Sequence, residues 1–118
     1  MSNLKSLQDA AWIYYSQWSK TKTYSKALKG EVAITRKGWN HLRSGSKSKR
    51  RSISDKIRRL GLLKQARYVI EHATTFTVGT KATEKHFILQ LSLPGKKQKV
   101  KVIIKKDKKG RYYFFSVM

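Results

Sequence analysis

The prevailing spacing of apolar residues changes close to Ala73, and this change limits the folds open to the chain. Before Ala73 the apolar residues recur at every third or fourth position, which places them on one face of a helix. Beyond Ala73 they alternate with polar residues, which is the pattern of a strand with one buried face. Helices that precede a sheet in a chain of 118 residues predict a single domain of the α+β class over residues 1–118.

The first part of the chain predicts several helices and one early strand. Residues 3–19 form one helical pattern, and a second pattern after Ser52 is divided into two short helices at Gly61. Between them the run GEVAIT predicts a strand that ends at Thr35. Thr35 would then cap a short helix that carries Trp39, a ring expected to be buried rather than to stack on a base.

The last part predicts a sheet of strands joined by turns. Its four runs are TTFTVGT, EKHFILQLSLP, KVKVIIK and RYYFFSVM. Pro94-Gly95 and Lys108-Lys109-Gly110 supply turn residues, so an antiparallel meander of about four strands is the simplest arrangement. We expect the N-terminal helices to pack on one face of this C-terminal meander. Residues 1–30 would be an N-terminal helix and connection, and residues 31–118 the α+β core.

The charge predicts a polyanionic partner. The chain has 28 Lys and Arg against 6 Asp and Glu, a net charge of +22. Nucleic acid fits this surplus best, RNA before DNA, because phosphate contacts release counterions. A membrane partner is not expected, since the basic residues are spread from Lys5 to Arg111 instead of lining one amphipathic helix. With no apolar run of about twenty residues and no secretory signal, a cytoplasmic location is expected.

Several classes of site are disfavoured by the residues that are missing. The absence of cysteine excludes disulfides and thiolate zinc sites. The six acidic residues are scattered, which disfavours a metal-dependent nuclease. No phosphate-binding glycine loop or dinucleotide motif is present, so no cofactor and no metal is expected.

A basic segment, RKGWNHLRSGSKSKRR at residues 36–51, is the first candidate for nucleic-acid contact. It is equally consistent with a solvated loop, although such a loop would still bind phosphates. Two further cations, one in the second helical pattern and one in the sheet, complete the predicted contacts. The set is Arg36, Arg43, Lys47, Lys49, Arg50, Arg51, Arg67 and Lys101.

Alternation along the strands predicts a second candidate surface. If the more polar positions face outward, one face of the sheet gathers His86, Gln90, Ser92, Lys101, Tyr112 and Ser116. Cations and an aromatic ring on such a face would hold a phosphate chain and stack bases. The alternative is an ordinary solvated face.

The histidines permit metal-independent cleavage of RNA, in which the ribose 2′-hydroxyl is the nucleophile and the protein supplies an acid, a base and cations. His41 and His86 are the candidates for proton transfer, and His72 would instead interact with a helix C-terminus. An ordinary surface role is the alternative for each histidine.

The segments ITRKGWNHLRS, RLGLLKQARYVIEHA and GRYYFFSVM together resemble the small RNase-like domains of the barnase, EndoU, colicin and RelE (BECR) superfamily, in its phage and mobile-element branch. The resemblance covers residues 31–118 and implies a metal-independent endoribonuclease or toxin that acts on tRNA or other cellular RNA. It implies catalytic roles for His41 and Ser116. His86 and Tyr112 are further catalytic candidates because alternation predicts that they share one face of the sheet. The catalytic glutamate and paired histidines of the best-known members have no counterpart here.

Three functions therefore stay open. An endoribonuclease of this kind would have an acidic antitoxin or immunity protein as its inhibitor. A non-catalytic, strongly basic DNA- or RNA-binding protein from a mobile element would explain the charge and the aromatic residues equally well. A protein that inhibits its host by capturing an acidic partner is the third.

Overall fold

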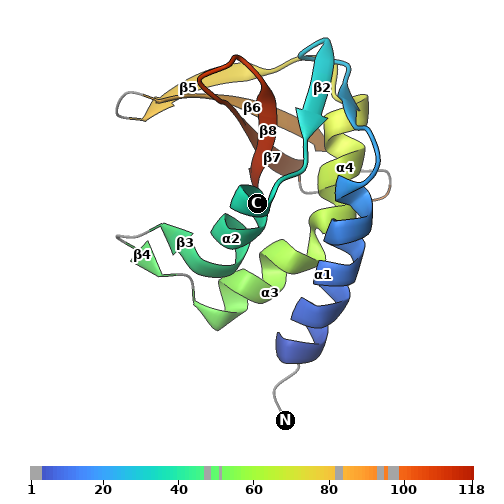
Figure 1. Ribbon diagram of the computed structural model, residues 1–118, viewed down its shortest axis with the longest axis vertical. Helices are drawn as coiled ribbons and strands as arrows, with labels where there is room; N and C mark the ends of the chain where they lie inside the picture. Colours follow the sequence, from blue (N-terminus) through green and yellow to red (C-terminus); the bar gives the residue numbers. More distant parts are fainter. Residues whose placement is uncertain (1–3, 47–48, 51, 82–83, 93–94, 96–98) are drawn as a thin grey trace.

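The computed structural model describes residues 4–46, 49–50, 52–81, 84–92, 95 and 99–118 and has an α+β fold (Figure 1). The helices are α1 (Leu4–Ser19), α2 (Arg36–Ser44), α3 (Ile53–Gly61) and α4 (Leu63–His72). The strands are β1 (Tyr24–Ser25), β2 (Gly30–Ala33), β3 (Gly45–Ser46), β4 (Lys49–Arg50), β5 (Thr77–Lys81), β6 (Glu84–Ser92), β7 (Lys99–Lys106) and β8 (Tyr112–Val117). The predicted fold class is confirmed, with helices mostly in the first part and the main sheet at the end.

The main sheet contains the predicted meander and extends beyond it. Its order is β1-β2-β8-β7-β6-β5, and β5 to β8 pair antiparallel with their neighbours in sequence. β2 lies parallel to β8, with Val32 opposite Tyr112, and β1 adds a short edge. The sheet is therefore mixed and six-stranded. The short apolar run GEVAIT, with its β-branched residues, predicts the strand. Its pairing with β8 joins residues about eighty positions apart, which a local pattern cannot encode.

The turn between β7 and β8 forms where the Lys-Lys-Gly run predicts it. Gly110 has a φ of +82°, which a residue with a side chain rarely adopts. The carboxylate of Asp107 accepts hydrogen bonds from the backbone N–H groups of Lys109 and Arg111, each at 2.9 Å. These bonds hold the pKa of Asp107 below its usual value, and they fix the reversal of the chain before β8.

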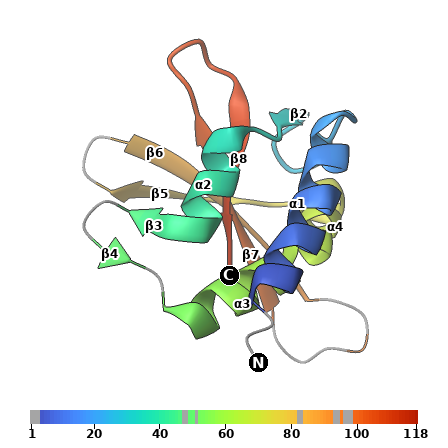
Figure 2. The same ribbon diagram turned by 60° about the horizontal axis from the view of Figure 1, so that its bottom comes forward.

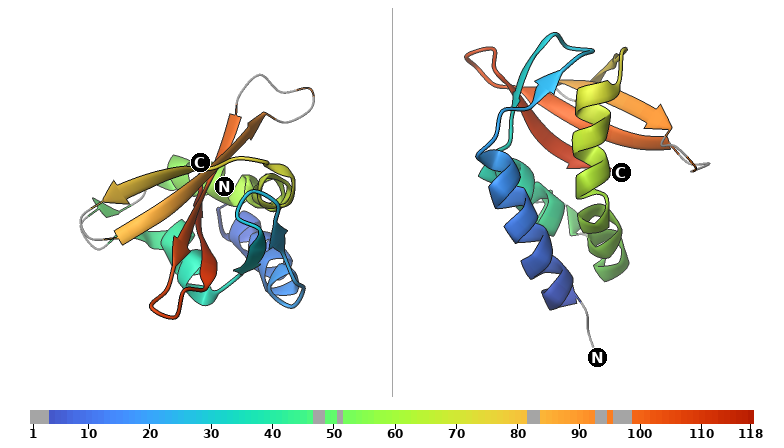
Figure 3. Two further views of the ribbon diagram at one scale, coloured as in Figure 1. Left: turned by 90° about the horizontal axis from the view of Figure 1, so that it is seen from above. Right: turned by 90° about the vertical axis from the view of Figure 1, so that its right-hand side faces the viewer.

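Helices α1 and α4 cover one face of the sheet (Figure 3). Tyr15 and Trp18 of α1 contact the ring of Phe114 on β8, with ring centroids 6.2 and 5.4 Å apart. α4 buries Leu63, Ala66, Val69 and Ile70, and it packs against β6 and β7. Their buried partners include Leu89 and Val102, which lie opposite each other in the sheet. We call this side the core face.

Helix α2 continues along β8 where β2 ends (Figure 2). Trp39 and Leu42 point into the core, as the pattern predicts for Trp39. Gly38 makes the close approach possible, because a Cβ built there would lie 2.4 Å from the carbonyl oxygen of Phe114. The hydroxyl of Thr35 does not cap this helix: it is buried and has no hydrogen-bond partner among the residues that the structure describes. The carbonyl of Thr35 instead accepts a hydrogen bond from Tyr15, whose pKa is raised by burial.

The predicted break at Gly61 separates α3 from α4. Ser52 caps α3 by accepting a hydrogen bond from the backbone N–H of Asp55 at 3.1 Å. Ile53 and Ile57 continue the apolar face of α3 but are 61% and 41% exposed, so only the C-terminal end of this helix, at Leu60, enters the core. In the part of the chain that the structure describes, no helix combines the length and apolarity needed to span a membrane.

A β-bulge in β8 decides which of its side chains share a face. Phe114 lies opposite Ile104, whereas Ser116 lies opposite Ile103, so Phe115 is an extra residue in the ladder. Tyr112 and Phe114 therefore face the core side, while Phe115 and Ser116 both lie on the other side. Strict alternation would place Tyr112 and Ser116 together.

Candidate nucleic-acid interface

The side of the sheet opposite α4, which we call the open face, carries the polar positions of β6 and β7. His86 lies opposite Lys105 and Gln90 opposite Lys101. Between these two pairs, Ile88 lies opposite Ile103 on the same side, whereas Leu89 and Val102 point to the core face. His86, Gln90 and Lys101 thus share a face, as alternation predicts, and Ser92 follows on the same side of β6. Gln90 and Lys101 are exposed, and His86 is half-buried.

His41 reaches the open face from α2 and stacks on Phe115. The two ring centroids are 3.9 Å apart, with an angle of 31° between the planes. The ammonium group of Lys105 lies 3.8 Å from the centroid of the same Phe115 ring. An imidazole and a cation therefore meet on one half-buried aromatic ring, where the ring holds both in place.

A second cation rests on a neighbouring ring. The Nζ atom of Lys37, one residue into α2, lies 5.5 Å from the ring centroid of Tyr113. Tyr113 is opposite Lys105 in the sheet, so the two cation–ring pairs are adjacent. α2 and β8 together thus form a row of alternating positive charge and aromatic surface along one border of the open face.

The ring of His86 leans toward the outer strand β5. A Cβ built on Gly79 would lie 2.6 Å from Nε2 of His86. The imidazole therefore lies across Gly79 and fits there because glycine has no side chain. His86 and His41 are on the same side of the sheet but are separated by β7 and β8. Strands are about 4.8 Å apart, so the separation is on the order of 10 Å.

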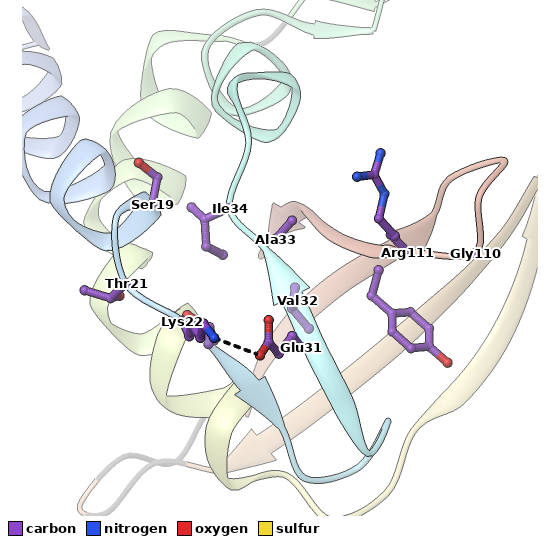
Figure 4. A pocket seen from close by; sticks show the side chains of 11 residues that line it. Ser19, Thr21, Lys22, Glu31, Val32, Ala33, Ile34, Gly110 and Arg111 are labelled. Atoms are coloured by element: carbon purple, nitrogen blue, oxygen red, sulfur yellow. Dashed lines mark ion pairs between the residues drawn. The ribbon is translucent and has the colours of Figure 1, made fainter.

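Tyr112 lies away from this surface, on the core face. Its ring makes an edge contact with Phe87, and it helps to line a hollow of about 480 Å³ between the end of α1, β2 and the β7–β8 turn. Figure 4 shows Lys22 and Glu31 in that hollow, with an ion pair of 4.0 Å between them. The bulge thus puts Tyr112 on the opposite side of the sheet from His41 and His86.

Ser116 is on the open side but is fully buried. Its hydroxyl accepts a hydrogen bond of 2.7 Å from Nη1 of Arg59, which also donates to the carbonyl of Val117 at 3.1 Å. Nε of Arg59 forms an ion pair of 2.9 Å with Asp55, one turn earlier in α3. The environment of Ser116 is that of a structural contact that fastens α3 to the end of β8.

Three of the predicted basic contacts have side chains that the structure describes, and these three lie on different surfaces. Arg36 lies over the ring of Trp12 on α1, 5.5 Å from its centroid, and Arg67 pairs with Glu71 at 3.8 Å on α4, on the core side of the sheet. Lys101 alone of this set is placed on the open face. Lys47 and Arg51 lie outside the described residues, as do the side chains of Arg43, Lys49 and Arg50.

Sequence reasoning missed the residues that hold the row together. Lys105 alternates with Lys101, so its position on the open face could have been predicted from the pattern of β7. Alternation puts Phe115 and Tyr113 on the same side of β8, but both alternating sets of this strand are aromatic, so the sequence does not decide which set faces the helices. Arg59 is indistinguishable by spacing from the exposed Arg58 beside it. Within the described ranges, no three His, Asp or Glu side chains are grouped as a metal site would require.

Comparison with known proteins gives one match. The family described as Large polyvalent protein-associated domain 3 matches residues 2–114. No curated protein and no solved structure matches the chain.

Proposed function

The chain belongs to the Large polyvalent protein-associated domain 3 family, and from this premise we propose that it binds single-stranded nucleic acid, RNA before DNA, across the open face. The observation that carries the proposal is the row formed by His41, Phe115 and Lys105. A domain named for its association with large polyvalent proteins would act as one module beside others, which agrees with a binding role. Its RNA partner would be met in the cytoplasm.

Charge and ring chemistry together favour an unpaired strand. The net charge of +22 supplies attraction to any phosphate chain. Aromatic rings add attraction for bases, but only where those bases are not already stacked and paired in a duplex. Lys101 and Lys105 would contact phosphates, while the imidazole of His41 and the ring of Tyr113 lie against bases. Duplex DNA or RNA would then be held by charge alone.

Fluorescence anisotropy with a labelled twelve-nucleotide oligouridine, in EDTA, tests this assignment. Phe115→Leu keeps apolar volume but removes the ring that positions His41 and Lys105. Affinity should fall about tenfold, in line with the ~1–3 kcal/mol of the one stack that a displaced imidazole would lose. Tyr24→Leu removes an exposed ring from β1 and should leave the affinity unchanged. Equal affinities for the two variants, or equal affinity for single and double strands, would refute it.

Metal-independent RNA cleavage is the second candidate, and the contact of His41 and Lys105 with one ring favours it. A base and a cation that share a surface would suit removal of the 2′-hydroxyl proton and stabilisation of the charged phosphorane. His86, about 10 Å away, would bind a neighbouring phosphate rather than serve as the paired acid, so the leaving 5′-oxygen would take its proton from water.

Cleavage is tested with the same oligonucleotide under saturating protein. The expected products end in 2′,3′-cyclic phosphate, form in EDTA, and disappear with His41→Ala. A substrate with 2′-deoxyribose throughout should be bound and left intact. If wild-type protein binds oligouridine and never cuts it, the binding function stands and the catalytic one falls.

A further inference from the structure

Strand β5 forms the edge of the main sheet opposite β1, and α1 and α4 pack mainly on other strands. In the described residues it pairs with β6 alone, from Thr77 opposite Ile88 to Lys81 opposite Glu84. Figure 1 shows the β5–β6 hairpin reaching away from those helices. One row of β5 backbone N–H and C=O groups therefore faces outward, where a further strand could pair with it.

Apolar side chains stand beside this edge. Phe76 and Val78 are 41% and 54% exposed, and their spacing of two places both on the same side of the strand. Phe76 makes an edge contact with Phe87, at 5.5 Å between ring centroids, and Phe87 lies opposite Val78. The three form a continuous apolar border on the core-face side, in which Phe87 packs against the core while Phe76 and Val78 are exposed.

The β5 edge has few of the features that commonly prevent a sheet edge from pairing with another strand. Exposed edges are usually guarded by charged residues, by proline, or by very short strands. Thr77, Val78 and Gly79 carry no charge, and the strand is five residues long. The opposite edge of the same sheet, β1, is two residues long and so offers little room for a partner.

The charge of the chain decides what kind of strand would pair with β5. Two copies with a net charge of +22 each repel one another, which opposes pairing between like edges. Lys85 is exposed on β6, opposite Thr80 and on the same side of the sheet as Val78. An acidic segment gains both from the overall field and from this nearby ammonium group.

We propose that the β5 edge is a docking site for an extended acidic segment of another polypeptide, with apolar side chains at alternate positions. The segment adds a strand next to β5 and lays its apolar side chains over Phe76 and Val78. Its acidic side chains lie near Lys85 and in the positive field of the domain. This surface is separate from the open face, so a nucleic acid and the segment can be bound together.

The test uses a capped nine-residue peptide in which Val and Glu alternate. Two further versions carry N-methyl groups on alternate backbone nitrogens, one version on the odd positions and the other on the even positions. Strand addition predicts slowed hydrogen exchange in residues 77–81 and about tenfold weaker binding for one methylated version. Val78→Lys should weaken the unmodified peptide about tenfold as well. Ile13→Lys adds the same charge at an equally exposed apolar position on α1 and should bind as wild type does.

Three results would overturn the proposal. Equal binding of all three peptides would mean that charge alone attracts them. Equal binding to Val78→Lys and Ile13→Lys, with folding of both checked by circular dichroism, would place the site elsewhere. Sedimentation of the free protein as a dimer that Val78→Lys dissociates would make a second copy the occupant instead. None of these results depends on whether the open face binds nucleic acid.

Discussion

Arg59 shows how the surroundings of one side chain separate it from its neighbour. Arg58 and Arg59 both contact Asp55 at 2.9 Å, but the side chain of Arg58 is 52% exposed and that of Arg59 is 11% exposed. Arg59 alone reaches β8, where it donates to Ser116 and to Val117. A partly buried guanidinium with three acceptors should matter more to stability than an exposed one with a single acceptor.

Removing these contacts should separate the two arginines in urea unfolding. Arg59→Ala should lower the free energy of unfolding by about 2–4 kcal/mol, because it removes the donor to Ser116 and to the carbonyl of Val117 and one of the two ion pairs described for Asp55. Ser116→Ala should cost about 1–2 kcal/mol through the loss of one charge-assisted hydrogen bond. Arg58→Ala, the matched control, should cost under about 1 kcal/mol. A Ser116→Ala protein with full stability would contradict a structural role for the hydroxyl.

For single residues, alternation predicts the correct face of the sheet wherever the pairing between strands is regular. His86, Gln90 and Lys101 lie on one face because β6 and β7 pair without interruption. Tyr112 and Ser116 were expected to join them, and the bulge separates the two. An inserted residue in one strand depends on how that strand meets its partner, and neither run of residues reveals it alone.

Helix α2 depends on a glycine for its contact with β8. A Cβ at Gly38 would approach the Phe114 carbonyl oxygen to 2.4 Å and the Tyr15 hydroxyl to 2.8 Å, and a backbone carbonyl cannot swing aside as a flexible side chain can. Gly61, the last residue of α3, has no atom within 4 Å of the same built position. The two glycines therefore differ in what their neighbours tolerate, although both lie in helices.

Alanine substitution at the two positions should have opposite effects on the melting temperature. Gly38→Ala should destabilise the fold by about 2–3 kcal/mol, because α2 must move away from β8. Gly61→Ala should stabilise it by about 0.5–1 kcal/mol, because alanine loses less backbone freedom on folding. Binding of oligouridine should weaken in Gly38→Ala, which displaces His41 and Lys37 from the open face, and should be unchanged in Gly61→Ala. Similar melting temperatures for the two variants would show that α2 can shift at little cost.

A strong local pattern predicts which segments form helices and strands, but it does not predict where β2 and α2 lie, because distant partners decide their positions. The period of apolar residues indicates α1, the break at Gly61 and the strands of the meander. The pairing of β2 with β8 and the position of α2 beside β8 arise from contacts between segments far apart in sequence. The row of His41, Phe115 and Lys105 exists only because of that second group of contacts, so the sequence supplied its residues without their arrangement.

For the whole molecule, the surplus of positive charge makes specific and nonspecific contacts hard to distinguish by affinity alone. With 28 Lys and Arg, almost any substitution of a lysine weakens binding to a polyanion somewhat. The dependence of affinity on salt separates the two, because each phosphate contact releases condensed counterions when it forms. A lysine that does not contact phosphate contributes only a screened, long-range attraction, which fades over about 8 Å at physiological ionic strength.

A double substitution on the open face should therefore change the salt slope itself. Lys101→Ala with Lys105→Ala should make the slope of log affinity against log salt shallower by about 1.4, at ~0.7 for each phosphate contact with a single strand. Lys20→Ala with Lys26→Ala removes the same charge from exposed positions after α1 and beside β1, and should leave the slope unchanged. Anisotropy titrations of oligouridine at salt concentrations from about 50 to about 300 mM would measure the slopes of both double variants. Slopes lowered equally by the two double variants would mean that RNA is held by the field of the whole domain, with no preferred face.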